Sequence, residues 1–580
     1  MKIRLARTAG FCMGVRRAIE MVLTEANRDT GPLYTYGPLI HNDQVMRLLE
    51  SKGVLPISDI QGIQKGTIAI RAHGIPPEQR RLLKSSGLRI IDATCPRVAR
   101  VQSIVRYHTH KGYGAIILGE SDHPEVIGLK GYGDGMAYVI GDIEELPDMT
   151  ETERIIVVAQ TTQEKRHYLE VVESIKKRFP EAIVFDTICS ATERRQDEIR
   201  GLAPQVDAIV VVGGYHSGNT RRLAQVAKST GVPTFHVEKE TEIDPKALSA
   251  MEVIGVTAGA STPNWMIKKV AQQIEEIRSR KETSVGRVLR YVFKFLFQTN
   301  LVVSAGAFFL TYASLILSGK DPDFVHPSLS FLYIYAMHVL NRFLDKGAGF
   351  YNDPERAAFF KKHRDVIMAS GLAAIIGCIS LSYSIGFTTF LAVVGLNILG
   401  CIYSLPILPV RRRKLGRYFK IKDIPGSKTL AQALAWGAVI ALLPLLEAEG
   451  PSKASVIASF LYVFSVVYVR CAFFDIFQVQ GDLIVGSETI AIALGEKRTL
   501  LLLKAVILLG AAHLMSAPLY STAGSFSHLL ILSYLSLSIA LLTYERRWLY
   551  PSTRLEALVE ANLFFAGFLG LVSHYASWPL

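Results

Sequence analysis

The chain has 580 residues and a formal net charge of +13 at pH 7, with 20% charged and 49% hydrophobic residues. Its mean hydropathy is nevertheless positive, at +0.26, which indicates two domains of different solvent preference in one chain. The positive charge gathers in loops beside apolar segments, which argues against nucleic-acid binding and favours a membrane surface.

Cys12, Cys95 and Cys189 are the only cysteines in the first half of the chain. Each follows an apolar, strand-like run and a short polar turn, and the intervals between them are similar, at 83 residues (12 to 95) and 94 residues (95 to 189). This spacing predicts an α/β fold of three similar lobes around one axis. Open α/β sheets bind ligands beyond the carboxyl ends of their strands, so the three thiols are expected to form one site.

Three thiolates select soft metals or an iron–sulfur cluster, and they leave one coordination position open to a substrate. No fourth cysteine in this half of the sequence closes the site. Ordinary buried thiols and a three-thiolate zinc site are the alternatives. The favoured interpretation is a catalytic cluster with one open iron.

Other predicted strands in this half end in imidazoles, hydroxyls, amides and glycines. Such groups offer many hydrogen bonds to phosphate oxygens without a wall of basic side chains, so they indicate a small phosphorylated ligand. Glu125 is the carboxylate among them and the expected proton source. The other members are His41, His73, His123, Thr162, Ser217, Asn219 and Ser261.

These residues closely resemble the 4-hydroxy-3-methylbut-2-enyl diphosphate reductases over about residues 1–275. The resemblance rests on the three cysteines and on the segments Ala72-His73-Gly74, His123-Pro124-Glu125 and Ser217-Gly218-Asn219. It implies a 4Fe-4S cluster on Cys12, Cys95 and Cys189 and catalytic roles for Glu125, Thr162 and His123. It also implies that the diphosphate is held by His41, His73, His123, Ser217, Asn219 and Ser261.

The implied reaction removes the substrate's hydroxyl as water and gives isopentenyl and dimethylallyl diphosphate, the last step of the methylerythritol phosphate route to isoprenoids. No ferredoxin-like or flavin-binding segment is visible, so we expect an external electron donor such as ferredoxin or flavodoxin. One position departs from the family pattern: Gly218 stands where a second serine is usual. Weaker diphosphate binding is expected from this change.

The composition changes near residue 295, after a basic segment, 276–294, that is expected to be a linker helix on the membrane surface. Beyond it, apolar stretches recur near the ~20 residues that cross a bilayer. The nine stretches are 295–318, 326–344, 364–384, 386–405, 429–447, 455–474, 499–517, 526–543 and 555–577. They predict an all-α integral membrane bundle of nine transmembrane helices over residues 295–580.

Basic clusters occupy the loops on one side of this predicted bundle, which places that side in the cytoplasm. With nine spans, the N-terminal domain lies in the cytoplasm and Leu580 lies outside the inner membrane. No cleavable signal peptide precedes the first domain, which agrees with cluster thiols that are not disulfides.

Two acidic loops are expected at the cytoplasmic ends of the second and sixth spans, where ionisable groups usually mark a site or pathway. This layout resembles the intramembrane prenyltransferases of ubiquinone and menaquinone biosynthesis. The resemblance implies an allylic diphosphate as ligand and Mg²⁺ on Asp345, Asp475 and Asp482. It also implies diphosphate contacts from Asn341, Arg342, Arg356 and Lys428.

Three positions depart from the prenyltransferase pattern, because Arg342, Gly349 and Gln478 stand where aspartates are usual. Magnesium prefers carboxylate and phosphate oxygens, so this loss should weaken the site. Prenyl transfer remains the favoured function of the membrane domain. A non-catalytic anchor or prenyl-lipid-binding module is the alternative, and a transporter is a third reading, disfavoured because the polar residues gather at one face instead of the midplane.

Overall fold

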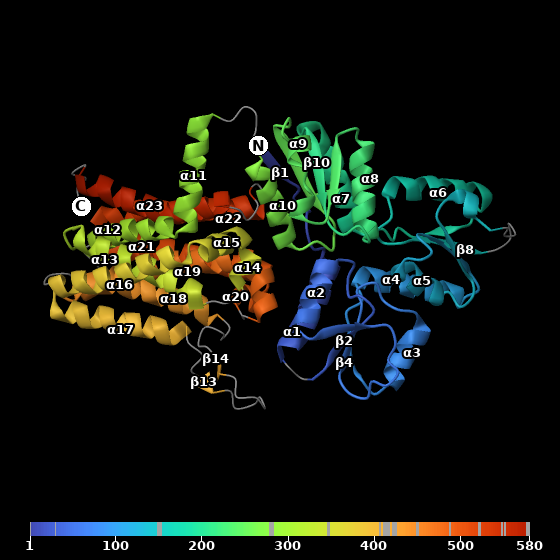
Figure 1. Ribbon diagram of the computed structural model, residues 1–580, viewed down its shortest axis with the longest axis horizontal. Coiled ribbons are helices and arrows are strands. Elements are labelled where there is room, and N and C mark those ends of the chain that lie inside the picture. Colours follow the sequence, from blue (N-terminus) through green and yellow to red (C-terminus); the bar gives the residue numbers. More distant parts are fainter. Residues whose placement is uncertain are drawn as a thin grey trace. The chain divides into compact units, whose positions relative to one another are not determined.

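Two compact units make up the chain, Met1–Glu282 and Thr283–Leu580. The structure is a computed structural model (Figure 1). It describes residues 2–28, 31–147, 154–277, 283–344, 348–404, 408–409, 418–419, 426–447, 452–486, 489–519, 524–546, 549 and 553–575.

Three four-stranded parallel sheets form the first unit, in the orders β3-β2-β4-β5, β7-β6-β8-β9 and β11-β10-β12-β1. The strands are β1 (Lys2–Leu5), β2 (Leu33–Tyr36), β3 (Val54–Ile57), β4 (Thr67–Ile70), β5 (Arg89–Asp92), β6 (Gly114–Leu118), β7 (Ala137–Ile140), β8 (Ile155–Ala159), β9 (Ile183–Val184), β10 (Ala208–Val212), β11 (Thr234–Val237) and β12 (Val253–Ala258). Every sheet repeats one topology, in which the second, first, third and fourth strands of a lobe lie side by side. β1 is the fourth strand of the last lobe, so the chain's first strand closes the third sheet.

Helices cover these sheets, which is why the central strands are apolar throughout. All five residues of β8 and of β10 are buried, as parallel strands packed on both faces require. The helices are α1 (Met13–Arg28), α2 (Asp43–Ser51), α3 (Pro77–Ser85), α4 (Pro96–Thr109), α5 (Pro124–Gly131), α6 (Lys165–Arg178), α7 (Ser190–Leu202), α8 (Gly218–Ser229), α9 (Pro245–Leu248) and α10 (Asn264–Glu276). The prediction of an α/β fold with three similar lobes is confirmed.

The second unit is helical, apart from the two-residue antiparallel strands β13 (Leu408–Pro409) and β14 (Tyr418–Phe419). Its helices are α11 (Ser284–Gln298), α12 (Leu301–Leu317), α13 (Val325–Leu344), α14 (Ala348–Asn352), α15 (Pro354–Lys362), α16 (Arg364–Ile385), α17 (Phe387–Ser404), α18 (Ser427–Gly437), α19 (Lys453–Val485), α20 (Ile490–Leu494), α21 (Glu496–Ser516), α22 (Gly524–Glu545) and α23 (Thr553–Tyr575). A π-helical turn, Ala438–Leu442, and a 3₁₀ turn, Leu443–Leu445, extend α18.

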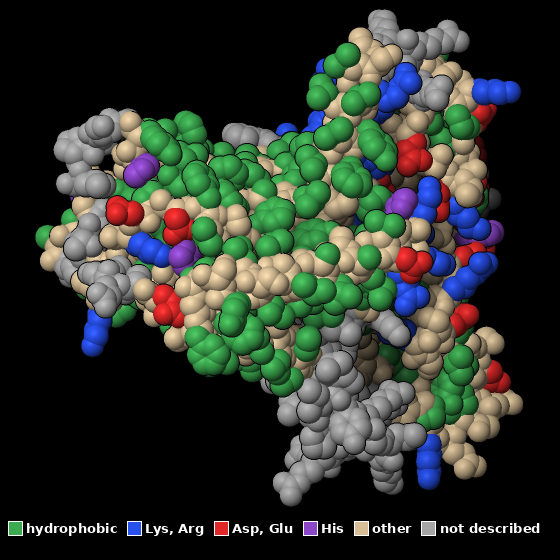
Figure 2. All heavy atoms as spheres, turned by 60° about the vertical axis from the view of Figure 1, so that its left-hand side comes forward, with side chains coloured by type: hydrophobic (Ala, Val, Ile, Leu, Met, Phe, Trp, Pro, Cys, Tyr) green, Lys and Arg blue, Asp and Glu red, His purple; other side chains and the backbone are tan. Residues whose placement is uncertain are grey.

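Apolar side chains face outward from these helices (Figure 2). Leu372 and Ile376 of α16, Leu508 and Leu509 of α21, and Phe568 of α23 are all more than half exposed. An apolar surface of this kind on a soluble protein would be unfavourable, so it is a lipid-facing surface. The second unit therefore makes the chain a membrane protein.

The nine predicted spans are not confirmed. Among the described residues, six helical segments are long and apolar enough to cross a membrane, or seven when the bent pair of α11 and α12 is counted as one span. The six are Arg364–Ile385, Ser427–Leu445, Lys453–Val485, Glu496–Leu519, Gly524–Glu545 and Thr553–Tyr575. The apolar part of α17 is shorter, and α13 contains two histidines, an asparagine and an arginine that lower its hydropathy.

The acidic stretch after the predicted sixth span is not a loop. α19 runs for 33 residues and includes Asp475 and Asp482, and it ends at Gly486, which has a φ of 82°. The sequence offers only the isolated Gly481 before that point, and a single glycine is tolerated inside a helix. Seven residues make two helical turns, so both carboxylates lie on the same face of α19.

Candidate functional site

The strand ends of the first unit carry eight of the predicted site residues and Thr161 in three equivalent sets. In the three lobes, the first strands (β2, β6 and β10) are followed by His41, His123 and Ser217, respectively. The third strands (β4, β8 and β12) are followed by His73, Thr161 and Ser261. The fourth strands (β5, β9 and β1) are followed by Cys95, Cys189 and Cys12. All nine residues line one pocket, together with Glu125, Thr162 and Asn219. The repeated topology thus brings together residues that are far apart in the chain.

Each cysteine lies at the N-terminus of a helix. Cys95 and Cys189 are the N-cap residues of α4 and α7, and Cys12 directly precedes α1. The backbone N–H of Val15 donates to Cys12 Sγ over 3.5 Å. Helix N-termini stabilise negative charge on thiolates or on an anionic cluster. Burial raises the pKa of Cys95, hydrogen bonds from the backbone N–H groups of Arg97 and Val98 oppose this rise, and the neighbouring thiols of Cys12 and Cys189 add to it.

The spacing of the three thiols helps to distinguish a site for an iron–sulfur cluster from a site for a single zinc ion. Sulfurs bound to one tetrahedral zinc lie about 3.8 Å apart, because each Zn–S bond is about 2.3 Å long. In the part of the chain that the structure describes, the only trio of potential ligands whose atoms all lie within 4.8 Å of one another is His41, His73 and His123. The three cysteine sulfurs therefore do not all lie within 4.8 Å of one another, which is compatible with binding to different irons of one cluster.

Two further residues fit the pocket to an anionic cluster. A Cβ at Gly14 would lie 2.5 Å from Cys95 Sγ, so only glycine allows this thiol to approach α1. Arg195 of α7 is 4% exposed and donates to the carbonyl of Gly10, while its Nε has no hydrogen-bond partner. Its charge interacts with the thiols of Cys12 and Cys189. Sequence reasoning missed Arg195, because arginines on helices are usually surface residues.

Three imidazoles that lie close together form a further wall of the pocket. The ring centroids of His41, His73 and His123 lie 4.5 to 5.6 Å apart. Burial is the main reason that the pKa of each lies below its usual value, to about 4 for His123. Neighbouring imidazoles add to the shifts of His73 and His123, and Arg71 and His216 add to the shift of His41. His41 Nε2 and His73 Nδ1 are buried without a hydrogen-bond partner. Buried polar atoms of this kind are costly unless a ligand pairs with them.

The N-terminus of α8 completes this wall. Ser217 is its N-cap residue, and Asn219 Nδ2 is another buried atom without a hydrogen-bond partner. Ser261 Oγ donates to the carbonyl of His41 over 3.1 Å. A Cβ at Gly218 would lie 3.4 Å from the carboxylate of Glu120 and 3.6 Å from His123, which is ordinary contact. Helix N-termini with free donors bind phosphate oxygens.

Glu125 lines the same pocket as the histidines and the thiols and is 2% exposed. Its carboxylate accepts the backbone N–H of Thr161 over 2.7 Å and the Thr161 hydroxyl over 2.9 Å. Burial raises the pKa of Glu125 to about 7, against the opposing effects of these hydrogen bonds and of Arg222. A carboxyl group with this pKa is half protonated at neutral pH, which suits a general acid.

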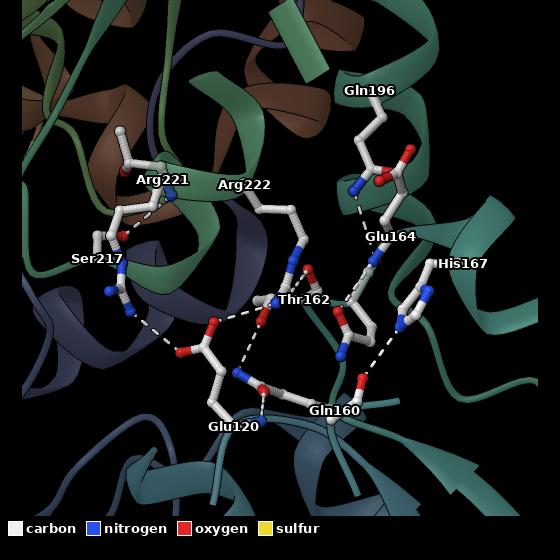
Figure 3. A network of polar contacts seen from close by, with 12 residues as sticks. Glu120, Gln160, Thr162, Glu164, His167, Gln196, Ser217, Arg221 and Arg222 are labelled. Atoms are coloured by element: carbon white, nitrogen blue, oxygen red, sulfur yellow. Dashed lines mark hydrogen bonds and ion pairs between the residues drawn. The ribbon is translucent and has the colours of Figure 1, made fainter. Parts of the chain in front are cut away.

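The resemblance implied a catalytic role for Thr162 beside Glu125, and the hydrogen-bond partner of Glu125 is the neighbouring Thr161. The hydroxyl of Thr162 instead accepts from Gln160 Nε2 over 3.0 Å, and Gln160 Oε1 accepts the backbone N–H of Glu120 (Figure 3). Because the Thr162 oxygen is engaged as an acceptor, its proton remains available to the pocket. Thr161 was not singled out because two successive threonines follow β8 and the sequence does not distinguish them.

A network of ion pairs connects two lobes beside these threonines (Figure 3). Glu120, which follows β6, pairs with Arg221 over 3.1 Å and with Arg222 over 3.0 Å, both on α8. Arg222 also donates to the carbonyl of Thr162 over 3.0 Å. The network ties the N-terminal part of α8, with Ser217 and Asn219, to the lobe that carries Glu125.

The second unit brings together a smaller polar cluster on α14, α18 and α19. Lys428 Nζ lies 3.5 Å from Asp475 and 3.9 Å from Asp482. Thr429 donates to Asp475 over 2.5 Å, and Asn352 Nδ2 donates to Asp482 over 3.0 Å. Thr429 was missed in the sequence, where only its neighbour Lys428 stood out. A Cβ at residue 481 would lie 2.1 Å from Asn352, so Gly481 allows this contact.

The remaining residues predicted for this cluster have other surroundings. Arg356 donates to the carbonyl of Phe297 over 3.0 Å and lies 3.5 Å from Glu556. Arg342 lies over the ring of Phe360. Asn341 belongs to the last turn of α13, and Asp345 lies outside the described residues. The structure therefore provides two carboxylates, an amide and a lysine here, which is enough for one magnesium ion completed by phosphate oxygens and water.

The fold and the first site define a class of protein: a three-lobed α/β oxidoreductase with a three-thiolate cluster site and a pocket for a phosphorylated ligand. The family model described as LytB protein matches residues 3–275. The 4-hydroxy-3-methylbut-2-enyl diphosphate reductase of Opitutus terrae is 43% identical over an alignment of 292 residues that covers 48% of this chain and 100% of that protein. The reductase of Aquifex aeolicus is 41% identical over 278 residues, 47% of this chain and 96% of that protein. The chain belongs to this reductase family through its first unit, and the resemblance seen in the sequence is confirmed.

Solved structures are similar to each unit separately. The reductase from Plasmodium falciparum is 28% identical, covers 47% of this chain and 87% of its own, and has a TM-score of 0.45. A UbiA homolog from Archaeoglobus fulgidus, solved with DMAPP and Mg²⁺, is 18% identical, covers 48% of this chain and 99% of its own, and has a TM-score of 0.36.

Proposed function

We propose that the first unit reduces 4-hydroxy-3-methylbut-2-enyl diphosphate to isopentenyl and dimethylallyl diphosphate. The observation that best supports this proposal is the shared pocket. It is lined by three thiols, a carboxyl group with a pKa of about 7 and buried donors without hydrogen-bond partners. In the reaction the C–O bond to the hydroxyl breaks, water leaves, and a C–H bond forms at either end of the allyl group. Two electrons and two protons are consumed, and the electrons come from an external ferredoxin or flavodoxin.

The protein's own residues orient the substrate and move protons. A 4Fe-4S cluster on Cys12, Cys95 and Cys189 would supply electrons and an open iron for the hydroxyl. Glu125 supplies the proton, with Thr161 fixing the direction of its carboxyl group. Thr162 can donate to the substrate's hydroxyl. The diphosphate binds to His41, His73, His123, Ser217, Asn219 and Ser261, which excludes water from the other end of the pocket.

Anaerobic purification of the full chain tests this proposal. Cys189→Ser should lose the intact cluster's EPR and Mössbauer signals and form neither diphosphate product, since the pocket holds no spare thiol. Cys401→Ser, in α17, is the matched control and should keep both the spectra and the turnover. Normal turnover by Cys189→Ser would exclude the proposed cluster site.

For the second unit we propose transfer of a prenyl group from a prenyl diphosphate to a lipid-soluble acceptor. The specific observation is the cluster of Lys428, Asp475 and Asp482 with Asn352. In such a transfer the bond between the prenyl carbon and the diphosphate breaks, a bond to the acceptor forms, and the acceptor loses a proton. Asp475 and Asp482 would hold Mg²⁺, and Lys428 would bind the departing diphosphate.

Membranes incubated with labelled prenyl diphosphates distinguish a transferase from an anchor. Asp482→Asn should abolish magnesium-dependent formation of prenylated lipid while reduction by the first unit continues. Asp365→Asn, at the start of α16, controls for the loss of one carboxylate. Unchanged lipid products with Asp482→Asn would favour a non-catalytic anchor or prenyl-lipid-binding module.

We also propose that the chain lies in the cytoplasmic membrane with its first unit in the cytoplasm. Proteolysis of inverted membrane vesicles should then remove the first unit, whereas sealed right-side-out vesicles should protect it. The opposite pattern would refute this orientation.

A further inference from the structure

α11 is an amphipathic helix whose apolar face is exposed. Val285, Val288, Leu289, Val292 and Leu296 recur at intervals of three and four residues, so they form one face of the helix. Their exposed fractions are 69%, 61%, 65%, 45% and 36%. A continuous apolar stripe of this kind needs a covering surface.

The opposite face of α11 is cationic. Arg287, Arg290 and Lys294 follow one another at intervals of three and four residues, and α11 contains no aspartate or glutamate. An apolar face opposite a basic face is typical of helices that lie in the interface of an anionic membrane. The basic face therefore indicates that the surface covering α11 is an anionic membrane, which the apolar stripe alone would not indicate.

The chain also turns sharply between α11 and α12. Asn300 adopts a left-handed conformation with a φ of 63°, and the two helix axes differ in direction by 72°. α12 has 17 apolar-rich residues, which is within the length range that spans a bilayer. When α12 stands along the membrane normal, α11 lies about 18° from the membrane plane, since 90 − 72 = 18. Figure 1 shows α11 set across the direction of α12 and α23.

The last turn of α11 is fixed to α15. Lys294 pairs with Glu355, and Gln298 Nε2 donates to the same carboxylate over 2.7 Å. Arg356 donates to the carbonyl of Phe297 over 3.0 Å. These contacts hold the helix at its C-terminal end, while its earlier turns keep their apolar side chains exposed.

We propose that α11 binds the anionic phospholipid surface of the membrane that the second unit enters. The stripe from Val285 to Leu296 enters the boundary between headgroups and acyl chains, and Arg287 and Arg290 contact lipid phosphates. The proposal rests on the second unit being a membrane unit, and it is independent of prenyl transfer and of the reductase reaction.

Tryptophan scanning of the full chain in vesicles tests this proposal. Leu289→Trp places the probe on the apolar stripe, and Tyr291→Trp places the same probe on the polar side of the same helix. In vesicles of phosphatidylcholine and phosphatidylglycerol with brominated acyl chains, the added emission of Leu289→Trp should be quenched by bromine and resist aqueous iodide. Tyr291→Trp should show the reverse pattern.

A second set of measurements tests the role of the basic residues. Each basic residue near an anionic surface strengthens binding roughly fivefold, so Arg287→Gln combined with Arg290→Gln should reduce bromine quenching of Leu289→Trp. Replacing phosphatidylglycerol with phosphatidylcholine should have the same effect. Iodide access to Leu289→Trp in anionic vesicles would overturn the proposal. Shielding of Leu289→Trp from both quenchers would overturn it as well, because it would identify a protein surface as the partner.

Discussion

Replacing Glu125 with glutamine should stop catalysis and stabilise the first unit at the same time. Glutamine keeps the shape of the side chain and can still accept the backbone N–H of Thr161, while the Thr161 hydroxyl can reverse its role and accept from the amide. The substitution removes only the acidic proton and the negative charge. General acid catalysis contributes about 10²- to 10⁴-fold, so turnover should fall by that factor with little change in substrate affinity.

The effect on stability follows from the raised pKa. Burial moves the pKa of Glu125 from 4.5 to about 7, and each pKa unit corresponds to about 1.4 kcal/mol, so the ionised group costs the native state about 3 kcal/mol. A carboxyl group whose pKa is raised on folding destabilises the native state as the pH rises from about 4.5 to about 7, and the cost is constant above that. Glu125→Gln should therefore be more stable than the parent at pH 8 and similar to it at pH 4.5.

Thermal unfolding of the anaerobic full chain in detergent measures this difference. About 3 kcal/mol corresponds to a rise in the unfolding temperature of the first unit on the order of 5 °C or more. Glu173→Gln is the control, because Glu173 is 73% exposed and its replacement should have no pH-dependent effect. An unfolding temperature that falls at pH 8, or a shift that is equal at both pH values, would refute the burial argument for Glu125.

Three other predictions concern the same pocket. Gly218→Ser should fold normally, because its Cβ meets only ordinary contacts, and the added hydroxyl should lower KM by up to about tenfold, measured by steady-state kinetics. Arg195→Gln should shift the cluster's reduction potential to more negative values in an EPR-monitored titration, because a buried positive charge near Cys12 and Cys189 is lost. Binding of inorganic pyrophosphate should take up protons, because an anion raises the pKa of His123 from about 4. Affinity should thus rise as the pH falls toward that value, and calorimetry in two buffers should detect the uptake.

The first unit was largely predictable because its strands are short, continuous apolar runs that stop at polar turns. β8 and β10 are such runs, and residues that follow them line the pocket. The choice between Thr161 and Thr162 was not predictable, since alternation of side chains ends with the strand at Ala159 and the turn decides which hydroxyl faces Glu125. Arg195 was not predictable either, because its burial depends on packing between lobes.

The second unit was less predictable because hydropathy does not fix where a helix bends or stops. The stretch 295–318 contains no proline, so the sequence predicted one span, yet the chain turns at Asn300, since asparagine tolerates the left-handed conformation. α19 continues through Asp475 and Asp482 because nothing before Gly486 ends it. The prediction of a loop at Asp475 and Asp482 was therefore wrong, because these polar residues lie within a helix.

In the proposed reductase function, equivalent positions of different lobes also determine the orientation of the substrate in the pocket. Glu125 and Asn219 are the second residues of α5 and α8, so they occupy equivalent positions in two lobes. One position carries an acid with a pKa of about 7, and the other carries an amide that lines the pocket beside Ser217 and Ser261. In the proposed reaction Glu125 would serve the hydroxyl end of the substrate, and Asn219 would bind the diphosphate together with the three histidines. Three equivalent cysteines would suit a cluster that has threefold symmetry about its open iron.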